Sequence, residues 1–242
     1  MKMENYKDLL YQKYVTSHTD NNKNIKNDLK DYNKSYDQHF SSFIPTNKES
    51  VIIDLGCGYG SFVFWLQTTG YKNVFGIDSS KEQIDKGKKL GVSNLIHGNA
   101  FEYISSINEK YDLIIAKDFL EHLAPEEVFS FLELCNKSLK SGGSILLQVP
   151  NAESPYFGRI RYGDFTHEVA YTKSSITQIL KVNNFKDIEV TPWLPVRSSF
   201  LSNIRFLLWK IAIFILKIPL ILETGKKDFI FTMNIIVKAK KL

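Results

Sequence analysis

Three glycines in the stretch VIIDLGCGYG stand at every second position, directly after a short apolar run. Glycine lets a chain turn sharply and brings backbone N–H groups close to a ligand. The apolar run predicts a β-strand and the following residues predict a helix, so the turn lies at the carboxyl edge of a sheet, where α/β proteins bind nucleotides. The predicted cofactor-binding residues of this turn are Asp54, Gly56, Cys57, Gly58 and Gly60.

The spacing of these glycines distinguishes between kinds of cofactor. The dinucleotide fingerprint is G-x-G-x-x-G, but position 61 is Ser61 and the third glycine comes one place early. The spacing therefore favours a nucleotide-like cofactor other than a dinucleotide. An NAD-dependent oxidoreductase and a non-catalytic cofactor-binding module are kept as alternatives from other functional classes.

Short β-rich runs alternate with amphipathic segments after Val51. The runs are VIIDL, NVFGID, NLIHG, YDLIIA and SILLQV. This alternation is typical of a parallel sheet with helices on both faces. The prediction is an α/β, Rossmann-like fold with a seven-stranded, mostly parallel sheet. The predicted fold is completed by four later elements: a helix near 174–182, a strand FKDIEV, an apolar helical insertion at about 199–223 and a last strand FIFTMNIIVKAKK.

Length, charge and cysteine content limit the class of protein. A chain of 242 residues that is 43% hydrophobic can bury a full core in one domain. Its formal net charge of +5 is mild and spread along the chain, so no nucleic-acid partner is expected. Cys57 and Cys135 suggest neither a disulfide framework nor a metal site, and no secretion signal is visible. We expect a cytoplasmic protein.

Five blocks of sequence resemble the motifs of class I S-adenosylmethionine-dependent methyltransferases, in the correct order. They are DLGCGYG, GID, GNAFEYI, YDLIIAKDFLEHL and LKSGGSILLQVPN, and they span roughly Val51 to Asn151. The resemblance implies S-adenosylmethionine as cofactor and methyl transfer as reaction. It also implies a methyltransferase domain at 51–242, preceded by an N-terminal helical arm or lid at 1–50.

A looser similarity narrows the acceptor. The stretch YGDFTHEVAYTKSSITQIL and the late apolar insertion are similar to methyltransferases of bacterial surface-polysaccharide biosynthesis, such as those of capsule and O-antigen. This similarity implies O-methylation of a sugar or sugar-linked group, on the polysaccharide or on a nucleotide- or lipid-linked precursor. The alternative is another small acceptor, either quinone-like or phosphate-bearing.

The remaining cofactor contacts follow from the ends of the next strands. Asp78 ends the second strand, where a carboxylate can accept both ribose hydroxyl groups, and Ser79 follows it. The resemblance places Asn99 where the family often has an acid, so its side-chain carbonyl is expected to accept the adenine amino proton. Two neighbours, Ala100 and Phe101, are expected near the adenine ring.

The resemblance also places the backbone of Lys117 against the methionine portion, with a solvated side chain. Removing the proton of an acceptor hydroxyl calls for a base. We expect His167, in DFTHE after the fifth strand, to be this base, with His122 and Asp118 as alternatives. Glu121 is expected to be a solvated or capping acid.

Acceptor contacts are expected from FGRIRYGD and from the N-terminal arm. Arg159, Arg161 and Tyr162 offer cations and a hydroxyl group to an anionic or sugar-bearing acceptor. His18 could fold over the site from the arm. No second carboxylate cluster completes a metal site at Asp164 and His167, so no metal is expected.

The apolar stretch NIRFLLWKIAIFILKIPLIL is interrupted by charges and a proline and is not expected to span a membrane. On a helix, Asn203, Lys210 and Lys217 recur every seven residues as one polar stripe. The remaining surface is apolar and carries Phe206, Leu207, Trp209, Ile213, Phe214 and Ile218. Such a surface needs a cover, which can be the domain's own core, a second subunit, or the inner face of a membrane in peripheral contact.

Overall fold

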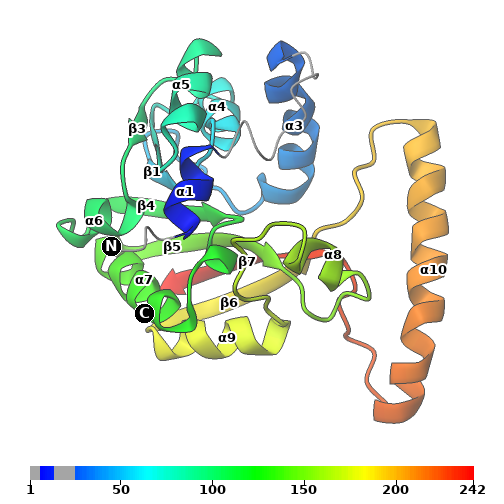
Figure 1. Cartoon of the computed structure of the whole chain (residues 1–242). Helices are drawn as coiled ribbons and strands as arrows, with labels where there is room; N and C mark the ends of the chain where they lie inside the picture. The colour runs from blue at the N-terminus through cyan, green and yellow to red at the C-terminus, as the bar shows by residue number, and fades with distance from the viewer. Residues whose placement is uncertain (1–5, 14–24) are drawn as a thin grey trace.

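The predicted sheet is confirmed in the computed structural model, which describes residues 6–13 and 25–242. Seven strands form one sheet in the order β3-β2-β1-β4-β5-β7-β6 (Figure 1). Pairing is parallel from β3 across to β5, whereas β7 runs antiparallel to both β5 and β6. The strands are β1 (Val51–Leu55), β2 (Asn73–Asp78), β3 (Leu95–His97), β4 (Tyr111–Lys117), β5 (Leu139–Pro150), β6 (Phe185–Pro192) and β7 (Asn234–Lys241).

Helices cover both faces of this sheet. One set consists of α3 (Ile25–Phe40), α4 (Ser61–Thr68) and α5 (Lys81–Lys89), and the other of α6 (Ala100–Ser105), α7 (Pro125–Ser138) and α9 (Lys173–Val182). Ile52 packs with the first set and Ile53 with the second, because successive side chains of a strand point to opposite faces. Two separate apolar cores therefore hold the strands rigid from both sides.

The sheet order reverses between β1 and β4, which are neighbours although two strands lie between them in the chain. In open α/β sheets a ligand crevice forms outside the carboxyl ends of the strands at such a switch point. The glycine turn follows β1 and a short 3₁₀ helix, η1 (Leu120–His122), comes soon after β4. The fold therefore brings the two motifs to one edge.

The predicted polar arm at 1–50 contains two described helices, α1 (Tyr6–Gln12) and α3. α3 packs firmly on α4, since the buried rings of Tyr36 and Phe40 each lie 4.9 Å from the ring of Phe62. His39 is also buried, and one of its ring nitrogens lies 2.7 Å from the carbonyl oxygen of Leu194. The second half of the arm is thus built into the domain, whereas His18 lies outside the described residues.

The predicted helical insertion is α10 (Phe200–Thr224), which stands beside the body of the protein (Figure 1). Ser199 caps its start, and Gly225 ends it in a left-handed conformation. Within this helix only Ile213 is buried, so α10 as a whole does not belong to the domain's core. No helix among the described residues is long and apolar enough to cross a membrane.

The packing of α3 gives a first prediction. Phe40→Ala should lower the free energy of unfolding by about 3–5 kcal/mol, because it removes a fully buried aromatic ring and leaves a cavity. Urea denaturation measures this loss. Tyr32→Ala on the same helix is the control, since Tyr32 is 45% exposed and should cost less than about 1 kcal/mol. Equal small losses in both variants would show that α3 is detachable from the domain.

Candidate active site

Steric contacts within the protein explain why two positions of the glycine turn exclude a side chain. Gly56 and Gly60 have φ angles of 75° and 81°, a region that side chains disfavour. A Cβ atom on Gly56 would lie 2.4 Å from the ring of Phe119, and one on Gly60 would lie 2.8 Å from Leu95. Any larger residue at these two positions would displace β3 or the loop after β4.

Asp78 connects this turn to the next one. Its two carboxylate oxygens accept backbone N–H groups from Gly58 and Ser80, each at 2.8 Å. Burial raises the pKa of Asp78, and the two hydrogen bonds act against that rise. Each oxygen keeps a further lone pair for a ligand, so Asp78 can order the turn and still accept a hydroxyl group.

Asp54 near the end of β1 and Lys117 at the end of β4 line the same cavity and interact electrostatically. Burial raises the pKa of Asp54 to about 7, and Lys117 acts against this rise. One carboxylate oxygen of Asp54, Oδ1, has no hydrogen-bond partner among the described residues. A buried acceptor without a partner costs free energy, so this oxygen is ready to receive a donor from a ligand.

The side chain of Lys117 was expected to be solvated, but in the structure it forms an ion pair. Its ammonium group lies 2.6 Å from Oδ2 of Asp118, and Oδ1 of Asp118 accepts from the amide of Gln148 at 2.6 Å. Burial acts to lower the pKa of Lys117, but the nearby Asp118 carboxylate and other groups outweigh it and raise this pKa. Both oxygens of Asp118 are engaged, which makes Asp118 a partner of Lys117 more readily than a base.

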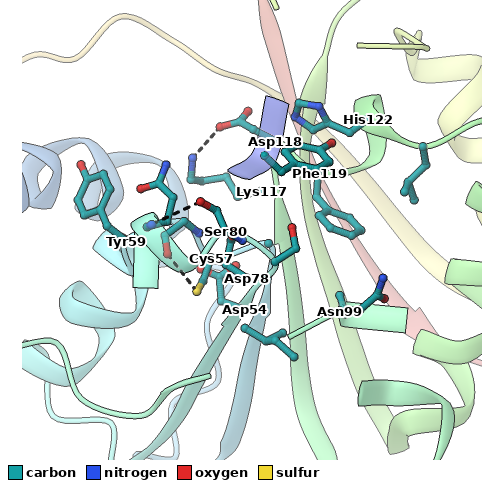
Figure 2. Close-up of a pocket in the computed structure, with 18 of the residues that line it drawn as sticks. Asp54, Cys57, Tyr59, Asp78, Ser80, Asn99, Lys117, Asp118, Phe119 and His122 are labelled. Carbon is teal, nitrogen blue, oxygen red and sulfur yellow. Dashed lines mark hydrogen bonds and ion pairs between the residues drawn. The ribbon is translucent and has the colours of Figure 1, made fainter. Parts of the chain in front are cut away.

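A cavity of about 570 Å³ lies along this edge of the sheet. Figure 2 shows the side chains of Asp54, Asp78 and Asn99 on its lower side and those of Asp118 and His122 above. The predicted residues that line it are Asp54, Gly56, Cys57, Gly58, Asp78, Ser79, Asn99, Ala100, Phe101, Lys117, Asp118 and His122. Gly60 does not line it and serves the shape of the turn.

Asn99 has a different role from the expected one. Its side-chain carbonyl accepts the N–H groups of Phe101 at 2.8 Å and of Glu102 at 3.3 Å, and so caps α6. This oxygen already accepts two N–H groups, which makes it less available to an adenine amino group, and the adenine contact of Asn99 stays a prediction. The amide nitrogen is the part of Asn99 that can meet a ligand.

His122 is held in one orientation by a chain of two hydrogen bonds. Its Nδ1 lies 2.7 Å from the hydroxyl oxygen of Thr166, and that hydroxyl donates to Oδ1 of Asp164 at 2.6 Å. Because the only hydroxyl proton of Thr166 goes to Asp164, we infer that Nδ1 of His122 carries a proton and that Nε2 is free to accept one. Burial, assisted by His167, lowers the pKa of His122 to about 4. The ring is therefore neutral at neutral pH.

His167 and Glu121 lie behind His122. The ring centroids of the two histidines are 4.7 Å apart, and Nδ1 of His167 donates to the carbonyl of Ile160 at 2.9 Å. His167 does not line the cavity, which favours His122 over His167 as the residue that meets an acceptor. The expectation of a solvated Glu121 was wrong, since Glu121 is 1% exposed and burial raises its pKa.

These three side chains also form a cluster of metal-ligand type. One ligand atom from each of Glu121, His122 and His167 lies within 4.8 Å of the others. The pair considered from the sequence, Asp164 with His167, is not the one that the fold assembles. The absence of a required metal stays a prediction.

Helix α1 lies across the cavity, and its role was not assigned residue by residue from the sequence. Tyr6, Lys7 and Tyr11 line the cavity together with Glu168. Both Tyr6 and Lys7 contact Oε1 of Glu168 at 2.9 Å, and Lys7 also donates to the carbonyl of His122 at 2.8 Å. Nothing in the local sequence of α1 signals these contacts, because their partners lie more than 100 residues away.

The expected acceptor residues of FGRIRYGD do not line this cavity. Arg159 and Arg161 lie on the short helix α8 (Phe157–Arg161), and Tyr162 follows with 76% of its surface exposed. The pKa of Glu168 is lowered mainly by its hydrogen bond from Lys7, and the charge of Arg161 makes a smaller contribution in the same direction. These residues are therefore outside the cavity, and Arg161 acts near its rim.

The fold and the cavity define a cofactor-binding α/β protein, and comparison with known proteins assigns the family. Residues 29–190 match a family described as a methyltransferase domain, which is more than half of the chain. The chain belongs to this family and is a class I S-adenosylmethionine-dependent methyltransferase. The match begins inside α3, in agreement with the packing of that helix on α4.

Two solved structures show the same fold. A SAM-dependent methyltransferase from Archaeoglobus fulgidus is 22% identical, with 98% of this chain and 100% of that chain covered and a TM-score of 0.63. Phosphoethanolamine N-methyltransferase 2 from Haemonchus contortus, in complex with S-adenosyl-L-methionine, is 15% identical, with 96% of this chain and 60% of that chain covered and a TM-score of 0.59.

Sequence relatives match a shorter region. Ubiquinone biosynthesis O-methyltransferase from Chelativorans sp. (strain BNC1) is 30% identical over 104 residues, which are 41% of this chain and 40% of that protein. Cyclopropane-fatty-acyl-phospholipid synthase from Escherichia coli (strain K12) is 25% identical over 100 residues, 40% of this chain and 25% of that protein. The match thus spans less than half the length of either relative.

Asp54 yields a prediction in which stability and binding change in opposite directions. At about pH 8, Asp54→Asn should raise the free energy of unfolding by up to about 4 kcal/mol, because the native Asp54 is then ionised at a cost set by a pKa shift from 3.8 to about 7. The gain should shrink near pH 5, where native Asp54 keeps its proton. Urea denaturation at both pH values measures it.

The same variant should bind S-adenosylmethionine more weakly, by about tenfold or more in calorimetry, because a charged acceptor becomes a neutral amide. Asp228→Asn is the control, because it makes the same change at an acid that is 73% exposed and lies outside the cavity, and it should change neither quantity appreciably. Weaker binding without a gain in stability at pH 8 would contradict the electrostatic cost assigned to Asp54.

Proposed function

We propose that this methyltransferase transfers a methyl group to a hydroxyl group of a small acceptor, with His122 as the base. The observation that carries the proposal is the neutral, oriented ring of His122 at the edge of the cofactor cavity. A hydroxyl group is a poor nucleophile until its proton begins to leave, so a lone pair held in place next to it assists the reaction.

The cavity residues fit S-adenosylmethionine. Asp78 can accept the ribose hydroxyl groups, and the unpartnered oxygen of Asp54 matches a donor such as the amino group of the methionine portion. Ala100 and Phe101 offer an apolar surface to an adenine ring. When bound, the cofactor supplies an electrophilic methyl group on a positively charged sulfur.

The other residues of the site keep the base and the acceptor in position. Thr166 and Asp164 orient the ring of His122, and its low pKa keeps Nε2 unprotonated at neutral pH. α1 contributes residues to the cavity wall and is held there by the contacts of Tyr6 and Lys7 with Glu168. Correct positioning of two reacting groups can lower a barrier by about 7–11 kcal/mol, so a weak base suffices.

For the acceptor, we retain a sugar or sugar-linked group as the first candidate. The cavity rim supports it, because the hydroxyl groups of Tyr6 and Tyr11 and the charges of Lys7 and Glu168 are groups that hydrogen-bond to sugar hydroxyls. A quinone-like phenol is the second candidate. The name of the Chelativorans relative, an O-methyltransferase of ubiquinone biosynthesis, supports that one.

Labelled S-adenosylmethionine and two acceptor panels distinguish these candidates. Nucleotide-linked and lipid-linked sugars form one panel, and catechol-like phenols form the other. The first candidate requires label in a sugar methyl ether, identified by mass spectrometry after hydrolysis. Label in phenols alone would replace it with the second candidate, and label on nitrogen alone would refute O-methylation.

The assignment of the base gives a kinetic prediction. His122→Ala should lower turnover by about 10²–10⁴-fold and leave the affinity for S-adenosylmethionine near that of the parent. His167→Ala, which removes a ring outside the cavity, is the matched control and should lower turnover by less than about tenfold. A larger loss in His167→Ala than in His122→Ala would return the role of base to His167.

The same cluster allows a prediction about metal ions. Turnover should be unchanged after treatment with EDTA and after addition of Mg²⁺, because burial raises the pKa of Glu121 and so disfavours its charged, metal-binding form, and His122 serves as a base. Methyl transfer before and after dialysis against the chelator measures this. Loss of activity that Mg²⁺ or Zn²⁺ restores would make His122 a ligand, contrary to the proposed mechanism.

A further inference from the structure

The outward face of α10 is an apolar surface that none of the described residues, 6–13 and 25–242, covers. Its large side chains are at least half exposed, among them Leu207, Leu208, Ile211, Phe214, Ile215 and Leu222. Ile211, Ile215 and Leu222 follow the four- and seven-residue spacing of one helix face. Contiguous apolar patches of this kind are uncommon on monomers and mark interaction sites.

The opposite face of α10 is less exposed. Ile213 is buried and Phe206 and Trp209 are half-buried, at the three- and four-residue spacing that places them on one side. These residues, expected from the sequence to share one apolar surface with Phe214, thus lie on another face of the helix. Burial within the described structure therefore accounts for the inward face only.

The charged residues around α10 indicate which kind of partner surface could bind its apolar face. Residues 197–227 contain six lysines and arginines and one acid, Glu223. Lys210 follows one border of the apolar face and Arg205 the other, whereas Lys217 turns toward the body, with its ammonium group 5.8 Å from the ring centroid of Phe231. Long basic side chains at the borders of an apolar face can reach anionic headgroups while the apolar residues enter the lipid.

We propose that α10 docks this methyltransferase on an anionic lipid surface. The helix lies in the plane of the interface, with its outward face in the boundary between headgroups and acyl chains. A second copy of the chain is the poorer occupant, because an isologous contact through this face would bring like-charged borders together. The inference concerns a surface distant in sequence from the catalytic residues and does not depend on the acceptor.

Vesicle sedimentation tests the apolar face with two variants of matched exposure. Phe214→Glu changes a side chain that is 63% exposed on α10, and Val182→Glu changes one that is 64% exposed on α9. The parent should bind vesicles of phosphatidylglycerol and phosphatidylcholine. Phe214→Glu should bind at least about tenfold more weakly, and Val182→Glu should bind like the parent.

A second pair of variants tests the charge. Arg205→Glu with Lys210→Glu should weaken binding to the anionic vesicles by at least about 25-fold, because each basic residue near such a surface contributes about fivefold. Lys181→Glu with Lys186→Glu makes the same change in net charge away from α10 and should have a small effect. Binding should also fall with added salt and be weaker to pure phosphatidylcholine.

Melting temperature and S-adenosylmethionine affinity should also be measured on all variants. These measurements show whether a substitution has changed the fold or the cofactor site instead of the lipid contact. Both should stay at the parent values. Equal binding by Phe214→Glu and Val182→Glu would overturn the proposal, as would absence of binding by the parent. A dimer that Phe214→Glu dissociates, without lipid binding, would assign the face to a second copy. A collapsed melting temperature in Phe214→Glu would assign it to the fold.

Discussion

The ion pair between Lys117 and Asp118 is the interaction on which the cavity depends. It lies at the switch point of the sheet, where the end of β4 meets the end of β1 and its buried acid, Asp54. Without a cation nearby, the cost of burying Asp54 would rise further, since its pKa is already near 7. Gln148 on β5 fixes the second oxygen of Asp118, so hydrogen bonds connect the end of β4 to β5, and the charge of Lys117 acts on Asp54 of β1.

A single loop after α8 connects the lid to the base. Thr166 orients His122, while Glu168, two residues later, holds Tyr6 and Lys7 of α1. The backbone N–H of Glu168 also donates to the carbonyl of Glu121 at 2.6 Å, next to His122 in the chain. Movement of α1 would therefore be felt at the base through two or three hydrogen bonds. Coverage of the cavity and orientation of the base form one arrangement.

The sheet, the glycine turn and Asp78 could be predicted because their signals are local: periodicity, glycine spacing and the end of a strand. The roles of Asn99 and Glu121 could not. A carbonyl that caps its own helix and one that accepts from a ligand look identical in sequence, and the burial of Glu121 is set by segments distant in the chain. The roles of Lys7 and Tyr11 on α1 were not predicted for the same reason, because these residues contact partners that only the fold brings close.

The orientation of α10 shows a further limit of periodicity. The sequence revealed a polar stripe through Lys210 and Lys217 and treated the remainder as one apolar surface. In the structure that remainder is divided, since Ile213 is buried and Phe214 is exposed. A helix that only needed to cover the domain would be expected to be polar on its outer side, as α5 is with its run of lysines. α10 is apolar there too, and this composition fits the lipid contact proposed for the helix.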